Sequence, residues 1–324
     1  SKLETSGVIM LVGSYIRHEQ PIAAMRIRQA VQKGLQVISV NPVAYDWSFD
    51  CAVEEVVQGQ AMVSLLASCV FSLQALVGCA LSDSWRKLLA GFGRTKVSDK
   101  IAKMISRSTG YVILGAYAQS HMQASVLHRL CLIIESMTEI KLVHLTPGTN
   151  SMGLQSIGFG PCHRFDAVNV ATGQSGHEML GLSKKVYLLQ QVELEYDHYD
   201  PQMAVSALEK AQTVVAITSF VSERMLAYAD VLLPAAAWTE FSGTWVSACG
   251  EVCSFSAISQ LFGESKSAWK IYRVLGNLLK CKGFSYHDIS QLRDDISLLK
   301  DGLMRELKQQ LSICKIKVSL IKVL

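Results

Sequence analysis

The sequence has few charged residues and few prolines for its length of 324. Charged residues make up 18% of the chain, hydrophobic residues make up 50%, and there are only 6 prolines. This composition is too apolar for a disordered chain and is sufficient for a large core. Low-complexity segments and repeats at solenoid spacing are also missing. The length predicts one large domain or two to three smaller ones.

A dense block of lysine and arginine is missing as well. The net charge is +4, and the basic residues are scattered. They include Arg26, Arg28 and Lys33 near one end and Lys315, Lys317 and Lys322 near the other. Nucleic acids are bound by clustered cations, so we expect a solvated basic surface and no nucleic-acid partner.

The cysteines lack the spacing of a disulfide framework or a metal site. There are nine of them, an odd number, and they are scattered along the chain. Three residues separate Cys249 from Cys253, and no second pair follows, whereas an iron–sulfur cluster needs about four closely spaced thiolates. We therefore predict no metal site, a reducing compartment, and thiols that mostly act as small buried apolar groups.

Several nucleotide and nucleophile motifs are absent. Gly13 and Ser14 follow a short apolar run, but no G-x-G-x-x-G pattern does, which argues against an ordinary NAD-binding unit. Residues 91–96 (GFGRTK) lack Walker spacing, and residues 153–158 do not match a nucleophile elbow. An unrelated nucleotide-binding domain is thereby disfavoured.

One apolar segment, residues 61–81, is long enough to cross a bilayer. It contains Ser64, Ser68, Ser72 and Gln74, and no second segment matches it. We interpret it as a helix buried in a large core, with a membrane span as the alternative.

Apolar runs and amphipathic stretches alternate along most of the chain. Strands are predicted at residues 7–12, 37–40, 111–114, 142–145, 186–190, 214–218 and 231–233, with helices between them. A long polar loop is expected over 146–183, an amphipathic helix over 289–303, and a short strand over 316–324. The pattern predicts layered α/β architecture with mainly parallel sheets and helices on both faces. We expect domains at 1–106 and 107–282 and a helical tail at 283–324.

In such sheets ligands bind at the carboxyl ends of the strands. Gly13 and Ser14 stand at one predicted end, and Asn150 and Ser151 lie in the glycine-containing loop 147–153 after another. Backbone N–H groups in such loops can bind a pterin or a phosphate. An ordinary surface loop is an equally good interpretation.

Four blocks, in order, resemble the molybdopterin oxidoreductase family. They are residues 11–28 (LVGSYIRHEQP…MRIR), 229–246 (ADVLLPAAAWTEFSGTWV), 263–271 (GESKSAWKI) and 286–293 (YHDISQLR). The resemblance is greatest to the branch that forms the large iron–sulfur subunit of respiratory NADH:quinone oxidoreductase.

The resemblance implies a molybdopterin-oxidoreductase fold. In this branch the region is a scaffold without a molybdenum cofactor that supports electron transfer from NADH to quinone. We therefore expect no cofactor in this chain, with iron–sulfur clusters in a preceding part of a longer protein. The implied partners are other subunits of the peripheral arm, on the cytoplasmic side of a bacterial inner membrane, with no membrane span of its own.

Departures from the family pattern support the scaffold interpretation. Tyr15 and Ile16 replace an Asn-Pro pair, and Glu251, in the turn 247–251, would repel a phosphate. The alternative is a fragment of an active molybdopterin enzyme of the formate-dehydrogenase type. The relic pterin-site positions implied by the family are Gly13, Ser14, Asn150, Ser151, Glu240, Gly243 and Thr244.

Overall fold

The computed structural model describes residues 6–78, 85, 89, 91–145, 148–161, 173–247 and 250–296. The chain forms two compact units: unit 1 runs to Ser151, and unit 2 begins at Met152. Each unit has a parallel sheet and a hydrophobic core of its own. The chain is therefore a layered α/β protein, as its alternating pattern predicted.

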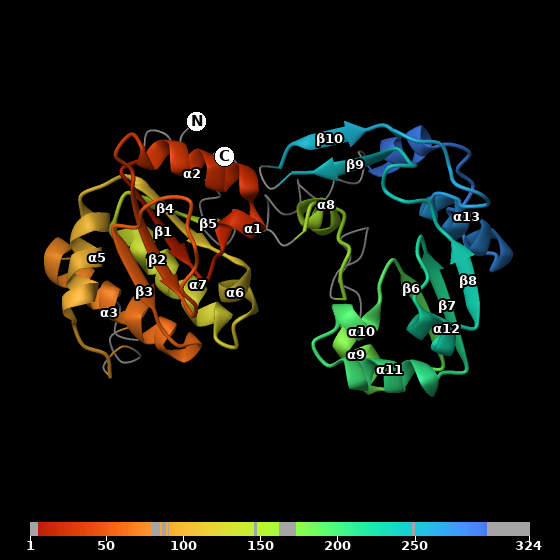
Figure 1. Ribbon diagram of the computed structural model, residues 1–324, viewed down its shortest axis with the longest axis horizontal. Helices are drawn as coiled ribbons and strands as arrows, with labels where there is room; N and C mark the ends of the chain where they lie inside the picture. Colours follow the sequence, from red (N-terminus) through yellow and green to blue (C-terminus); the bar gives the residue numbers. More distant parts are fainter. Residues whose placement is uncertain are drawn as a thin grey trace. The chain divides into compact units, whose positions relative to one another are not determined.

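Unit 1 is built on a five-stranded sheet in the order β3-β2-β1-β4-β5 (Figure 1). All four strand pairs are parallel. The strands are β1 (Val8–Val12), β2 (Gln36–Asn41), β3 (Val53–Val56), β4 (Gly110–Leu114) and β5 (Ile140–His144). The chain moves outward from β1 in one direction to β2 and in the other to β4, so the topological switch point lies between β1 and β4.

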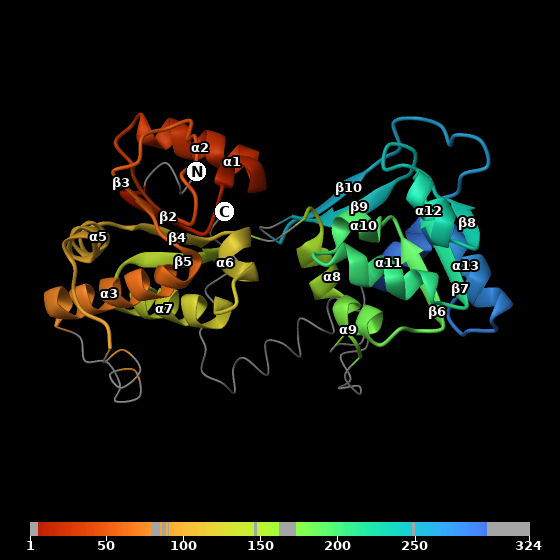
Figure 2. The same cartoon turned by 60° about the horizontal axis from the view of Figure 1, so that its bottom comes forward.

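Helices cover both faces of this sheet, as Figure 2 shows. They are α1 (Ile16–Glu19), α2 (Pro21–Val31), α3 (Gly59–Val77), α5 (Lys96–Ser106), α6 (Ala116–Ser120) and α7 (Ala124–Met137). Side chains alternate along β1: Val8, Met10 and Val12 pack with α3, α5 and α7, whereas Ile9 and Leu11 pack with α2. A strand buried on both faces reads as a continuous apolar run, which is why β1 was recognisable in the sequence.

Of the helices that the structure describes, α3 alone has the length and apolar composition of a membrane span. Half of its most apolar 18-residue window is buried inside unit 1. Met62, Leu66 and Leu73 lie in the core, and Ser72 bonds to Ser98 of α5. These contacts explain the apolar composition as that of a core helix.

Unit 2 contains a three-stranded parallel sheet in the order β6-β7-β8. Its strands are β6 (Val186–Gln190), β7 (Thr213–Thr218) and β8 (Val231–Pro234). Its helices are α8 (Ser151–Ser156), which starts at the last residue of unit 1, α9 (Gly176–Gly181), α10 (Leu194–Asp197), α11 (Pro201–Glu209), α12 (Glu223–Tyr228) and α13 (Ala268–Leu278). An antiparallel hairpin of β9 (Gly243–Val246) and β10 (Val252–Phe255) completes the unit.

Two expectations differ from the structure. The boundary at residue 106 falls inside unit 1, because β4 and β5 extend the sheet that begins with β1; the division comes after Ser151. The stretch 146–183 is not all loop, since it contains α8 and α9. The hairpin β9–β10 was not predicted. Of the helix expected over 289–303, residues 289–296 are helical, and the remainder and the strand 316–324 lie outside the described residues.

Candidate functional site

The turn after β1 brings two of the relic positions, Gly13 and Ser14, to the carboxyl edge of the unit 1 sheet. Gly13 has a φ of +56°, and a Cβ at this position would lie 2.5 Å from the backbone nitrogen of Ala118 in α6. The Gly13 N–H donates to Val40 O, and Gly13 O accepts from the Tyr117 N–H. Gly13 is therefore needed for the close approach of β1 and α6.

A carboxylate lies beside this turn, at the switch point between β1 and β4. Glu19 Oε1 accepts from the backbone N–H of Tyr15 at 2.7 Å, and Oε2 accepts from the backbone N–H of Ala116 at 2.9 Å. The hydroxyl of Ser14, which is fully buried, donates to the same Oε2 at 3.3 Å. Glu19 thus joins the turn after β1 to the turn after β4.

Aromatic rings surround the same turn. The Tyr15 ring stacks on His18 at 4.5 Å and on Tyr45 at 4.3 Å between centroids, and the edge of Trp47 lies 5.8 Å away. Partial burial, followed by the charge of Glu19, raises the pKa of Tyr45 above its ordinary value. Tyr45 therefore stays a neutral phenol at physiological pH.

Asn41 ends β2 at this edge and is almost fully buried. Its Nδ2 donates to Ser39 Oγ at 2.9 Å, and its Oδ1 has no hydrogen-bond partner among the residues that the structure describes. Because Oδ1 is an acceptor, it suits a donor such as water rather than an anion.

Asn150 and Ser151 lie where unit 1 ends and α8 begins. Both are half-buried, and Gly148 before them has a φ of +73°. The first residues of the predicted loop, 146–147, lie outside the described residues. The described part of the loop, 148–153, therefore comes after β5, as predicted.

The remaining relic positions, Glu240, Gly243 and Thr244, lie in unit 2. Glu240 Oε2 accepts from the Ala237 N–H at 3.2 Å and from the Ser265 hydroxyl at 3.4 Å. A Cβ on Gly243 would collide with the Phe255 ring, which crosses it from β10. Thr244 Oγ1 bonds Ser254 Oγ across the hairpin at 3.3 Å. Gly243 and Thr244 therefore take part in the packing of the β9–β10 hairpin, and Glu240 bonds the segment before it to Ser265.

The turn predicted at 247–251 connects β9 to β10. Ser247 N–H donates to Glu251 O at 2.8 Å, and Gly250 N–H donates to Ser247 O at 2.9 Å. Glu251 is exposed, and Cys249 lies outside the described residues. The departure from the family pattern therefore falls in a hairpin connection.

The carboxyl ends of β4 and β5 border a cavity of about 280 Å³ that the sequence did not reveal. It is lined by Leu114, Ala118, Gln119, Ala124, Ser125, His128 and His144. The two imidazole rings meet edge to face with centroids 4.7 Å apart. Partial burial, and then the neighbouring His128, lower the pKa of His144 below its usual range. The pairing of His128 with His144 depends on the strand order, which local sequence does not show.

Metal-ligating side chains do not gather anywhere in the described part of the chain: no three His, Cys, Asp or Glu residues form a group that could hold an ion. Cys69 and Cys131 are buried, and burial raises the pKa of the Cys69 thiol to about 12. Cys253 and Cys281 are exposed, so the expectation of buried thiols holds only in part.

Sequence reasoning thus singled out Gly13 and Ser14, which lie at the end of β1, but did not single out Glu19, Tyr45 or His144. Glu19 lies within the block 11–28 that resembles the family. The signal that could have identified it is a carboxylate a few residues after the turn that ends a strand. Its second bond, to Ala116, joins residues 97 apart and could not be read from local sequence.

The chain matches a known protein family over most of its length. The family model described as molybdopterin oxidoreductase matches residues 1–278. The 78 kDa subunit of mitochondrial NADH-ubiquinone oxidoreductase from Neurospora crassa is 41% identical over 66 residues, which are 20% of this chain and 9% of that protein. The Candida albicans counterpart is 37% identical over 78 residues, 24% of this chain and 11% of that protein. The matched segments are thus small parts of these relatives.

Two solved structures share the fold. Acetylene hydratase from Pelobacter acetylenicus aligns with a TM-score of 0.66 at 11% identity, over 87% of this chain and 48% of that one. The formyltransferase/hydrolase complex FhcABCD from Methylorubrum extorquens, in complex with methylofuran, aligns with a TM-score of 0.55 at 12% identity, over 93% of this chain and 75% of that one. At this identity the likeness concerns the fold alone.

Proposed function

The chain belongs to the molybdopterin oxidoreductase family, and from this premise we propose that it is a scaffold portion of the large iron–sulfur subunit of a respiratory NADH:quinone oxidoreductase. In this role it supports electron transfer from NADH to quinone without carrying electrons or a cofactor. The iron–sulfur clusters would belong to another part of the parent protein.

The observation that carries the proposal is the similarity to two 78 kDa NADH-ubiquinone oxidoreductase subunits. The sequence blocks that resemble this branch run in the same order from residue 11 to residue 293, so the likeness is not confined to one motif. Family membership alone would fit many oxidoreductases, because one fold hosts many functions.

Residues at the relic positions support a region without a cofactor. Ser14 and the N–H groups of Tyr15 and Ala116 already bond to Glu19. In unit 2, Glu240 and Thr244 bond to neighbours in their own unit. Polar groups that are paired within the protein are costly to redirect to a ligand. The residues present therefore do not fit the phosphates of a pterin dinucleotide cofactor.

The proposed partners are other subunits of the peripheral arm of the complex. The proposed location is peripheral to the respiratory membrane, on the side that faces the NADH pool, which in bacteria is the cytoplasmic side. The two curated relatives are described as mitochondrial. No part of this assignment needs a membrane span, because α3 is packed into the core of unit 1.

The test is to tag the chain in its source cells, solubilise the membranes gently and separate native complexes. The tagged chain should migrate with the NADH-oxidising complex, and elemental analysis should find iron in that complex but no molybdenum in proportion to the chain. Migration apart from NADH-oxidising activity would refute the scaffold assignment. About one molybdenum per chain would instead support the alternative, a fragment of an active molybdopterin enzyme of the formate-dehydrogenase type.

A further inference from the structure

Doubly wound sheets bind ligands at the topological switch point, and the turns after β1 and β4 lie at that point in unit 1. In the order β3-β2-β1-β4-β5, the crevice opens outside the carboxyl ends of β1 and β4. Backbone N–H groups in the turns that leave these strands are the usual donors to an anionic ligand. In this chain those turns contain Tyr15 and Ala116.

Both donors are bound by one carboxylate from the same chain. Glu19 accepts the Tyr15 N–H on one oxygen at 2.7 Å and the Ala116 N–H on the other at 2.9 Å. The buried Ser14 hydroxyl adds a third, longer bond. Two backbone N–H groups from two turns and a hydroxyl, all converging on one anionic group, form the donor set that a phosphate would require. Such bonds to a charged acceptor are stronger than neutral ones.

The planar side chain of Tyr15, in the same turn, is packed among aromatic rings. His18 and Tyr45 both stack on the Tyr15 ring, with interplanar angles of 21° and 8°. Trp47 closes the edge, and its Nε1 donates to Glu54 at 2.9 Å. Tyr15 stands where the family pattern has asparagine, so this ring replaces an amide that could bond a ligand.

We propose that Glu19 and Tyr15 close the ligand edge of unit 1 from within, with the Glu19 carboxylate in the place of a ligand anion. This inference rests on the proposed function and extends it by naming the residues that exclude a phosphate-bearing cofactor. The negative charge of Glu19 also works against anion binding, because the carboxylate repels any anion that approaches the donors it occupies.

The experiment compares the full chain with Glu19→Ala, using pyrophosphate as the probe and sodium chloride at matched ionic strength as the reference. Removing the carboxylate frees its donors, so Glu19→Ala should gain a saturable rise in Tm with pyrophosphate, by mass action. The wild-type chain should show no such rise. Glu139→Ala is the matched control, because Glu139 is exposed in the connection between α7 and β5, at the opposite edge of the sheet.

Two results would overturn the proposal: a wild-type chain that pyrophosphate stabilises as much as Glu19→Ala, or a folded Glu19→Ala that responds no more than Glu139→Ala. If Glu19→Ala does not fold, Glu19→Gln keeps the size of the side chain and removes its charge. Amide exchange at Tyr15 and Ala116 should then quicken by about tenfold, since charged acceptors hold N–H groups more strongly than neutral ones. Unchanged exchange at both amides would refute the role of Glu19.

These outcomes are separable from those of the scaffold proposal. If the chain migrates apart from the NADH-oxidising complex while Glu19→Ala still gains a pyrophosphate response, the scaffold role fails and the internal closure stands. If the chain migrates with the complex and no variant responds, the closure fails and the scaffold role stands.

Discussion

At the scale of single residues, Gly13 combines two requirements that only glycine meets without strain. Its φ of +56° lies in the left-handed region, and its missing Cβ leaves room for the backbone of Ala118. Left-handed strain in a non-glycine residue costs about 1–3 kcal/mol. The collision with a backbone nitrogen adds to this cost, because backbone cannot move aside as a flexible side chain can.

We therefore expect Gly13→Ala to lower the free energy of unfolding by more than about 2 kcal/mol, measured by urea denaturation. Gly34→Ala is the matched control: Gly34 also has a positive φ, +103°, but no atom lies within 4 Å of the position that its Cβ would take. The loss of stability in the control should therefore come from backbone strain alone. Equal losses in the two variants would mean that the approach to Ala118 contributes nothing.

The His128–His144 pair leads to a prediction about pH. Partial burial is the larger cause of the lowered pKa of His144, and His128 is the second. His128→Gln removes only the second cause, so NMR titration should show the pKa of His144 moving upward while staying below 6.5. An unchanged or lower pKa in this variant would contradict the assigned repulsion.

The same shift affects stability with a definite sign. The folded pKa of His144 lies below the unfolded value, so the unfolded chain binds the proton more readily. Neutral His144 makes its full contribution to the free energy of unfolding above the pKa of the unfolded chain. That contribution is lost as the pH falls from about 6.5 toward the folded pKa. The ring remains open to solvent, so the loss should be small.

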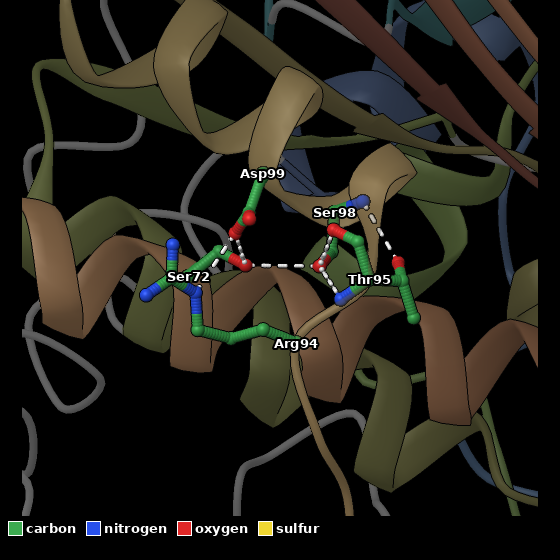
Figure 3. Close-up of polar contacts among 5 residues, drawn as sticks. All are labelled: Ser72, Arg94, Thr95, Ser98 and Asp99. Carbon is green, nitrogen blue, oxygen red and sulfur yellow. Dashed lines mark hydrogen bonds and ion pairs between the residues drawn. The ribbon is translucent and has the colours of Figure 1, made fainter.

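At the scale of elements, α3 is joined to α5 by a polar network that runs from the buried Ser72 and Ser98 to the exposed Arg94 and Thr95 (Figure 3). Ser72 Oγ bonds Ser98 Oγ at 2.9 Å and donates to Asp99 at 2.7 Å. Thr95 and Ser98 form a capping box at the start of α5, and Arg94 pairs with Asp99 at 2.9 Å. The network fixes where α5 meets α3, because a buried hydroxyl must find its partners.

Ser72→Ala should lower the free energy of unfolding by about 1 kcal/mol, because buried Ser98 loses a partner. Ser68→Ala on the same helix is the control, since the Ser68 hydroxyl donates only to Ser64 O one turn earlier. Such local bonds stabilise a helix little. Urea denaturation of both variants measures the difference, and an equal effect would show that the link to α5 is not stabilising.

The sequence predicted elements well where one physical signal dominates. Strand β1 is buried on both faces, so it appears as an uninterrupted apolar run. Helix α9 was missed although Ser175 and Glu178 form a capping box, a signal readable in the sequence. For the hairpin β9–β10 only the turn was predicted. Its strands gave no signal, because they have four residues each and all of these are exposed or half-buried.

At the scale of the whole molecule, strand order could not be predicted, and this explains the difference at residue 106. Local patterns show that β4 is a strand, but not that it pairs with β1, about 100 residues earlier. The same limit hid Glu19, whose bond to Ala116 forms only once β4 lies beside β1. The position of Gly13 and Ser14 at the carboxyl edge of the sheet was predictable because both follow directly after a strand.

Two separate cores lead to a prediction for the molecule as a whole. Leu66 is fully buried in unit 1, and Leu66→Ala should cost about 2–5 kcal/mol. Tyr228→Phe in unit 2 removes the hydroxyl that donates to buried Glu195, and should lower the free energy of unfolding by about 1–3 kcal/mol. Amide hydrogen exchange in the strands of each sheet then measures the stability of the two units separately.

Because the cores do not share residues, Leu66→Ala should speed amide exchange in β1, β2 and β4 and leave β6 and β7 unchanged. Tyr228→Phe should do the reverse. Each variant serves as the control for the other, since both are measured in the same full chain. If either variant speeds exchange in both sheets to the same extent, the two units unfold together, and the division after Ser151 separates no independent unit of stability.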